Sequence, residues 1–268
     1  MDGFAFSLAG LVVGTAVGAT GVGGGSLMTP ILILFYGISP AVAVGTDLLY
    51  ASVSKAFGVV LHGRRGTVDW KIVGWLSVGS VPAALITLLF LRHQAAGPGI
   101  DQLIKLTLAG AIVLTATFTL LQEPLLRLIN KGERAGSGPG FLVRHQRALT
   151  VVCGVLIGAL VTISSVGAGV IGMMLLLILY PTHAPIRLVG SDLAHAVLIT
   201  GIAGLGHAGL GTVNYSMLGF LLLGALPGIW LGTRIAFRLD DKGLKRTISV
   251  LLIFIGSTMA AKAVGARI

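Results

Sequence analysis

Long apolar runs separated by short polar segments dominate the chain. A helix that crosses a membrane needs roughly 20 apolar residues. Six runs have about that length: 40–62, 70–91, 101–121, 185–206, 215–235 and 247–264. Two further apolar segments, 4–36 and 148–180, are too long for one comfortable crossing. The pattern therefore predicts an all-α polytopic membrane protein.

The segment 4–36 is broken in its middle by "TGVGGGSLMTP", residues 20–30. Glycine costs about 1 kcal/mol and proline about 3 kcal/mol inside a helix. Irregular backbone at membrane depth survives only where protein or a polar cavity takes up its N–H and C=O groups. We therefore expect a polar cavity at this break, facing the positive end of the helix that follows, which would suit an anion.

The chain is an internal duplication. At an offset of 144, residues 10–25 align with 154–169; at an offset of 145, 39–48 align with 184–193 and 62–70 with 207–215. The alignment predicts an N-terminal membrane repeat at 1–121, a polar linker at 122–147 and a C-terminal membrane repeat at 148–268. Broken helices in matching places of two repeats indicate the binding site of a transporter.

The distribution of Lys and Arg predicts how the broken segments run. If each is a hairpin and the linker is cytoplasmic, 14 of the 19 Lys and Arg residues lie inside and 4 outside, with Lys55 within the membrane. A single kinked helix would give 10 against 8. The positive-inside rule favours the hairpin. The fold expected is two inverted-topology repeats, each a broken Gly-rich helical hairpin plus three transmembrane helices.

Composition agrees with a membrane protein and excludes other classes. Hydrophobic residues make up 55% of the 268 and charged residues 10%, whereas soluble domains have about 25% charged residues. The net charge of +10 lies in short loops, so it indicates topology and not nucleic-acid binding. A single cysteine, Cys153, and the absence of metal-ligand spacing or a nucleophile–base pair predict no metal, no cofactor and no enzyme.

The two breaks and a matching motif after them supply candidate substrate ligands. Backbone N–H groups and hydroxyls are the donors that a small anion would accept. The candidates are Thr20, Gly23, Gly24, Gly25, Ser26, Thr46, Ser164, Ser165, Gly167, Gly169 and Ser191.

Two acids occupy equivalent positions in the repeats, Asp47 and Asp192. A charged group at membrane depth is costly, so both are candidate proton carriers. His195 lies three residues after Asp192 on the same helix face and is expected to assist. The alternative is that each carboxyl only ties helices together. Lys55 could supply positive charge to an anion path or extend to the membrane interface.

These residues resemble a known family. "GATGVGGGSLMTPIL" followed by "AVAVGTDL", and "TISSVGAGVIGMMLL" followed by "IRLVGSDL", are similar to the TauE/SafE sulfite exporters, also called toluene sulfonate uptake permeases. The resemblance covers both halves. It implies a permease of the bacterial or archaeal cytoplasmic membrane for sulfite, sulfonates or sulfoacetate-like anions. Family members commonly have Ser or Asn where this chain has Asp47 and Asp192, which favours proton coupling here.

The sequence thus predicts a proton-coupled secondary transporter whose partners are a small anion and the lipid bilayer. An anion channel and a cation or metal permease remain alternatives. The oligomeric state is open, a homodimer included.

Overall fold

The computed structural model describes residues 2–20, 25–64, 66–94, 99–134, 144–236, 250 and 252–259, which form helices joined by short loops, with no strand among them. The all-α prediction is confirmed. The first half contains α1 (Asp2–Thr20), α2 (Gly25–Leu34), α3 (Pro40–Arg64), α4 (Trp70–Gln94) and α5 (Ile100–Arg134). The second half contains α7 (Gln146–Ser164), α8 (Val170–Leu179), α9 (Pro185–Gly209) and α10 (Tyr215–Ala236).

The helix bounds repeat along the chain as the duplication predicts. Helices α1 and α7 have 19 residues each, α2 and α8 have 10, and α3 and α9 have 25. The starts of α4 and α10, at Trp70 and Tyr215, follow the same register. Similar sequences in the two halves therefore form the same series of helices.

In both halves the short helix folds back along the long helix before it. Tyr36, just after α2, donates a hydrogen bond from its hydroxyl to the carbonyl of Ala5 near the start of α1, over 2.8 Å. Just after α8, the hydroxyl of Tyr180 pairs with that of Thr150 in the first turns of α7, over 2.9 Å. The end of each short helix thus meets the start of its long helix, so each pair is a hairpin and not one kinked helix.

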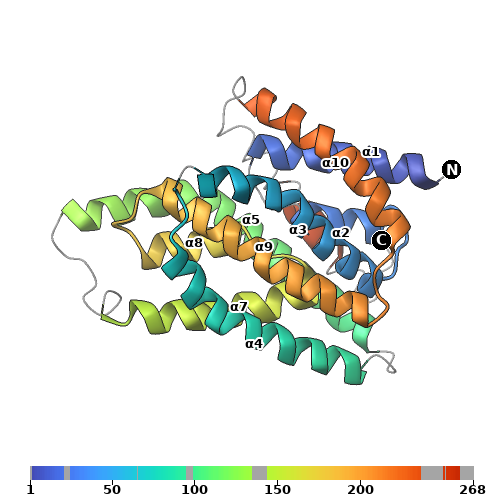
Figure 1. Cartoon of the computed structure of the whole chain (residues 1–268), viewed down its shortest axis with the longest axis horizontal. Helices are drawn as coiled ribbons and strands as arrows, with labels where there is room; N and C mark the ends of the chain where they lie inside the picture. The colour runs from blue at the N-terminus through green and yellow to red at the C-terminus, as the bar shows by residue number, and fades with distance from the viewer. Residues whose placement is uncertain are drawn as a thin grey trace.

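The two halves pack against each other reciprocally. Helix α1 lies along α10 and α4 lies along α7, while α3 packs against α9 between them (Figure 1). Glycines make the outer contacts close: a Cβ at Gly14 would lie 2.6 Å from the carbonyl oxygen of Ala225. In the matching pair, a Cβ at Gly158 would lie 2.7 Å from the Cα of Ser80. Small residues at these positions let the helix backbones touch.

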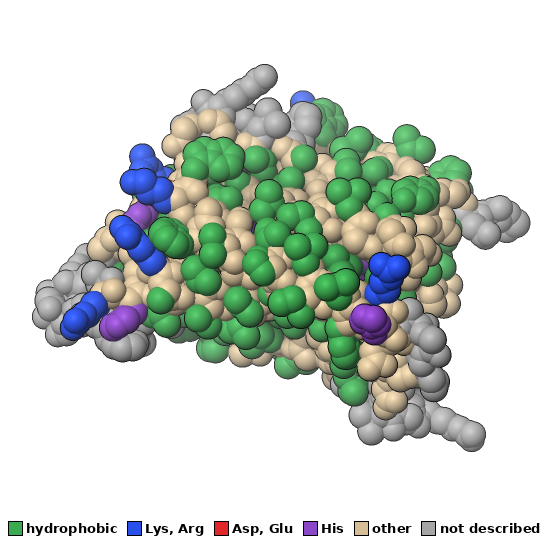
Figure 2. Space-filling model, turned by 60° about the horizontal axis from the view of Figure 1, so that its bottom comes forward, with side chains coloured by type: hydrophobic (Ala, Val, Ile, Leu, Met, Phe, Trp, Pro, Cys, Tyr) green, Lys and Arg blue, Asp and Glu red, His purple; other side chains and the backbone are tan. Residues whose placement is uncertain are grey.

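The outer surface is that of a membrane-embedded protein. Among the described residues, five helices are long and apolar enough to cross a bilayer: Trp70–Gln94, Ile100–Leu121, Gln146–Ser164, Pro185–Gly209 and Tyr215–Arg234. Large apolar side chains such as Ile86 and Leu205, each 68% exposed, point outward. Figure 2 shows hydrophobic side chains over the middle of one face and Lys, Arg and His side chains toward its two ends. Lipid, and not water, suits such a surface.

Helix α5 extends into the segment that the sequence marks as a linker. It continues past Leu121 and through Pro124 to Arg134. Leucines and charged helix formers follow Pro124, and their helix propensity favours continuation despite the proline. The first half of the 122–147 linker is therefore helical, and residues 135–143 lie outside the described residues.

Candidate functional site

The break between α7 and α8 has a backbone that few residues can adopt. Ser165 ends α7 in a left-handed conformation, with φ of 59°, and its N–H bonds to the carbonyl of Val161. Gly167 and Gly169 have φ of 117° and 145°, which residues with a Cβ rarely tolerate. These glycines are required by the path of the chain, as the sequence predicts for a break. Gly23 and Gly24 of the first break lie outside the described residues.

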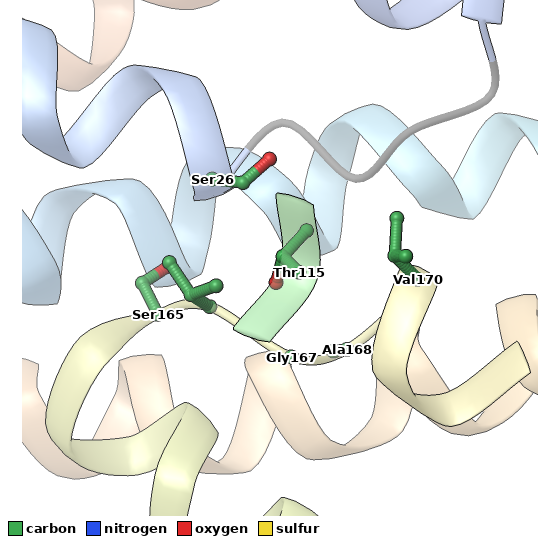
Figure 3. A pocket seen from close by; sticks show the side chains of 7 residues that line it. Ser26, Thr115, Ser165, Gly167, Ala168 and Val170 are labelled. Atoms are coloured by element: carbon green, nitrogen blue, oxygen red, sulfur yellow. The ribbon is translucent and has the colours of Figure 1, made fainter. Parts of the chain in front are cut away.

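A small cavity lies between the start of α2 and the break that joins α7 to α8. Its volume is about 10 Å³, counted as the space open to the centre of a water molecule, which is about what one water needs. The cavity is lined by Ser26, Thr115, Ser165, Val166, Gly167, Ala168 and Val170. Figure 3 shows Ser26, at the start of α2, across from the break that carries Ser165, Gly167 and Ala168. The structure thus brings together Ser26, Ser165 and Gly167, three of the substrate ligands predicted from the sequence.

The cavity walls offer hydrogen-bond donors without partners. The hydroxyls of Thr115 and Ser165 are buried, and neither has a hydrogen-bond partner. Such unpaired polar groups are uncommon inside proteins. Ser26 lies in the first turn of α2 and Val170 begins α8, so the positive ends of two helix dipoles also reach the cavity. This combination is suited to an acceptor-rich, negatively charged guest.

Lys55 brings a positive charge to the same place. It lies on α3, is the one Lys or Arg with a buried side chain among the described residues, and donates a hydrogen bond to the carbonyl of Ala168. Ala168 is itself part of the cavity wall. Lys55 therefore does not extend to the membrane interface, and its role as a positive charge on an anion path stays a prediction.

The two predicted carboxyls lie behind the cavity, each against a short helix. Asp47 is fully buried, and Thr29 of α2 donates a 2.5 Å hydrogen bond to its Oδ2. Ser165 also interacts with this carboxyl, although Asp47 Oδ1 and the Ser165 hydroxyl lack partners of ordinary hydrogen-bond geometry. Asp192 packs on α8, where a Cβ added to Gly172 would collide with its unpartnered Oδ1.

The buried charged groups of the two halves interact electrostatically. The ammonium of Lys55 interacts electrostatically with both Asp192 and Asp47. His195, also buried, faces Lys55 and pairs through Nε2 with the hydroxyl of Ser80 over 2.8 Å. Its part in proton transfer stays a prediction.

Other nominated hydroxyls are engaged elsewhere. Thr46 accepts a hydrogen bond from the backbone of Asn214 and Ser191 accepts one from Asp69, so both hold loops of the opposite half. Ser164 caps the end of α7, donating to the carbonyl of Leu160. Their role as substrate ligands stays a prediction. Thr20 and Gly25 flank the first break, and Gly169 precedes α8.

Sequence reasoning missed Thr115. It sits in an apolar run with other threonines, of which Thr117 and Thr119 bond to the carbonyl four residues earlier in their own helix. Nothing in the sequence distinguishes Thr115 from these, because only the packing of α5 against the breaks turns it into the cavity. For metals, the described residues contain no group of three His, Cys, Asp or Glu side chains able to hold an ion.

The helical fold, its apolar surface and its small polar cavity define a multi-pass membrane protein. The family model described as "Sulfite exporter TauE/SafE" matches residues 6–259. The chain belongs to this family. No solved structure matches it at a significant level.

Named relatives from bacteria and archaea agree. The "Probable membrane transporter protein YjnA" of Bacillus subtilis is 35% identical over 93% of this chain and 96% of its own length. YunE of the same organism is 24% identical, and the "Probable membrane transporter protein MJ0441" of Methanocaldococcus jannaschii is 23% identical, each over more than 90% of both chains. The family and its relatives are described as membrane transporters and not as enzymes.

Proposed function

We propose that this protein is a secondary transporter that moves small sulfur-containing anions, such as sulfite, sulfonates or sulfoacetate, across the cytoplasmic membrane together with protons. The observation that carries the proposal is the cavity between the start of α2 and the break that joins α7 to α8. The Thr115 hydroxyl, which has no hydrogen-bond partner, the Ser165 hydroxyl beside Asp47 and the adjacent ammonium of Lys55 are donors and charge of the kind that an oxyanion accepts. The family description names sulfite exporters, which points to the same class of substrate.

The packing directions of the helices support inverted repeats. In α3 and α9, Leu49 lies at Gly204, while Ser52 donates to the carbonyl of Val197, so the two helices run antiparallel. In α1 and α10, Gly10 and Gly18 lie at Leu221 and Ile229, so these helices run in the same direction. If the broken segments crossed as single kinked helices, α3 and α9 would run parallel. If the broken segments are hairpins and the two halves are inverted, α3 and α9 run antiparallel and α1 and α10 run parallel, as observed.

The length of the short helices supports alternating access around the breaks. A helix of 10 residues, such as α8, is about 15 Å long, about half the hydrocarbon thickness of a bilayer. Helix α8 is therefore too short to cross the bilayer by itself, so a helix that ends at one membrane surface and has this length begins within the hydrocarbon region. A cavity of about 10 Å³ is too small for a sulfonate, so the two hairpins must separate to admit one. Rocking of the halves about this site is the motion typical of inverted-repeat carriers.

Proton coupling is assigned to Asp47 and Asp192. Each lies against the short helix of a break, Asp47 through Thr29 of α2 and Asp192 against Gly172 of α8. A change in the charge of either carboxyl alters its interaction with that helix, which links protonation to movement of the cavity wall. The basic linker 122–147 is placed in the cytoplasm because this orientation leaves most Lys and Arg inside.

The first experiment is ligand binding to the purified protein. Thermal unfolding is followed with sulfite, sulfoacetate, taurine, sulfate, small carboxylates and divalent metals, at about pH 5.5 and about pH 7.5. A ligand that binds only the folded state raises the unfolding temperature. Stabilisation by sulfite or a sulfonate, larger at the lower pH, supports the proposal. Stabilisation by a metal alone would overturn it.

Transport in vesicles tests the carrier itself. Trans-stimulation by unlabelled substrate is expected for a carrier, whereas large single-channel currents would indicate a pore. Asp47→Asn combined with Asp192→Asn is expected to abolish the pH dependence of uptake. Concentrative, pH-dependent uptake by that double variant would contradict the assigned coupling.

A further inference from the structure

The charged groups around the cavity differ between the two halves. The acid is repeated, as Asp47 on α3 and Asp192 on α9, but the base is not. At the offset of 145, the counterpart of Lys55 is Thr200, whose hydroxyl bonds to its own helix. The site therefore holds one ammonium and two carboxyls, although the fold around it is built twice.

No other described element adds an ionisable group to this set. Helices α2 and α8 contain no ionisable residue. The Lys, Arg and Asp side chains described in α4, α5, α7 and α10 lie toward helix ends and are not buried. Besides the three charged groups, α3 contributes Tyr50, which interacts with Asp47, and α9 contributes His195, which faces Lys55 and pairs with Ser80.

The three charged groups lie at the cavity wall or behind it. Lys55 bonds to Ala168 in the second break, Asp47 is bonded by Thr29 and interacts with Ser165, and Asp192 packs on α8. Because they are buried within the membrane, an uncompensated charge among them is costly. The low-energy states of the site are those in which the charges of these groups and of any bound substrate sum to zero.

The condition of zero net charge determines how many protons the two carboxyls carry. Without substrate, the ammonium of Lys55 balances one carboxylate, and the other carboxyl carries a proton. When an anion of charge −1 enters, Lys55 balances the anion, and both carboxyls carry protons. One proton therefore enters with each monoanion. A dianion would leave a net charge of −1 even with both carboxyls protonated.

We propose that Lys55 is the fixed counter-cation of the transported anion, so that the carrier selects monoanions over dianions and moves each with one proton and no net charge. The inference rests on the proposed transporter function and deepens it. The preferred form of the substrate is then a sulfonate with one negative charge or hydrogensulfite, and not sulfate, the sulfite dianion or the sulfoacetate dianion.

The test compares methanesulfonate, a monoanion, with sulfate, a dianion of similar tetrahedral shape, in proteoliposomes of the full chain. Uptake of labelled methanesulfonate is expected to follow an inward proton gradient. It should not respond to a membrane potential set with potassium and valinomycin. Sulfate uptake is expected to be at least about tenfold slower, which is about 1.4 kcal/mol in the barrier. Methanesulfonate uptake driven by potential alone, or sulfate uptake at the same rate, would overturn the inference and leave the transporter function standing.

Substitutions of the carboxyls and of Lys55 test the role of each charged group. In Asp47→Asn with Asp192→Asn, Lys55 still balances the anion, but no carboxyl takes up a proton. Methanesulfonate uptake in this variant is expected to become sensitive to the membrane potential and insensitive to the proton gradient. Lys55→Thr, which copies the residue of the other repeat, is expected to lose at least about 90% of uptake, while Lys55→Arg retains uptake and the proton count.

Three further results bear on the proposal. If Lys55→Thr does not fold, as judged by size-exclusion chromatography, the potential dependence of the double Asn variant still decides the charge count. If His195 only assists proton transfer, His195→Gln is expected to slow uptake and to keep one proton per anion, and loss of that proton would overturn the assignment to the carboxyls. Absence of uptake and of binding for every sulfonate and for sulfite would overturn both the inference and the proposed function.

Discussion

Ser191 and Asp69 belong to different halves of the chain and are joined by a hydrogen bond of 2.8 Å from the Asp69 N–H to the Ser191 hydroxyl. The repeat reproduces the bond on the other side, where the Asn214 N–H donates to the Thr46 hydroxyl over 3.0 Å. Gly190 lets the loop approach, since a Cβ there would lie 2.6 Å from the carbonyl oxygen of Thr67. Each half thus fastens its loop before α4 or α10 onto the central helix of the other.

Removal of the Ser191 hydroxyl is expected to destabilise the protein. In Ser191→Ala the Asp69 N–H loses its acceptor in a partly buried loop, at a cost of about 1–3 kcal/mol. Unfolding in mixed micelles measures the change. Ser77→Ala is the control, because the Ser77 hydroxyl only bonds to a carbonyl of its own helix. Equal stabilities of the two variants would contradict the role of the Ser191 bond.

The packing glycines give a second prediction. In Gly158→Ala the new methyl group meets the backbone of Ser80, so α7 and α4 must move apart, at about 1–3 kcal/mol. Gly74→Ala, on α4, has no atom within 4 Å of the new Cβ. It should be neutral or stabilising by up to about 1 kcal/mol, since alanine favours helix. Thermal unfolding of both variants tests this contrast, and a loss of stability in Gly74→Ala alone would refute it.

The sequence was sufficient for the helices and insufficient for the contacts of single hydroxyls. The distribution of Lys and Arg predicts the hairpins, and the glycine break and the duplication predict where each helix is interrupted, because the backbone cost of glycine and proline is a local property. The break and the duplication also nominate Ser26 and Ser165, which the fold brings to one cavity. By contrast, the partner of a serine or threonine is set by whichever element packs over it. Thr46 could not be assigned to a loop of the other half, nor Thr115 to the cavity, from their neighbours in sequence.

Substitution of Thr115 distinguishes a structural role of its hydroxyl from a role in anion binding. Its hydroxyl is buried without a partner, so Thr115→Val removes an unsatisfied group and should leave stability unchanged or slightly increased. If the hydroxyl binds the anion, the variant loses a hydrogen bond to a charged group, about 1.5 kcal/mol or more, and affinity falls about tenfold or more.

Binding of methanesulfonate and thermal unfolding, measured on the same samples, test this prediction. The matched control is Thr117→Val, on the same helix but exposed, whose hydroxyl bonds to the carbonyl of Val113. It should bind the anion like the parent protein. A large loss of stability in Thr115→Val with unchanged affinity would show that Thr115 is structural.

The antiparallel directions of α3 and α9 lead to a prediction about membrane topology. Helices α3 and α9 begin at Pro40 and Pro185 and run antiparallel, so their starts lie at opposite ends of the pair. Ser39 and Thr182, in the exposed loops before these helices, should then lie on opposite sides of the membrane. With Cys153, the only native cysteine, replaced by alanine, single cysteines can be placed at either position.

A membrane-impermeant maleimide applied to intact cells is expected to label Ser39→Cys and to leave Thr182→Cys unlabelled. Both should react after the cells are permeabilised. The cysteine-free Cys153→Ala protein gives the background. Labelling of both positions from outside would contradict the antiparallel packing of α3 and α9 and the inversion of the two repeats. Labelling of Thr182→Cys alone would keep the inversion and reverse the orientation, which would put the basic linker outside, against the positive-inside rule.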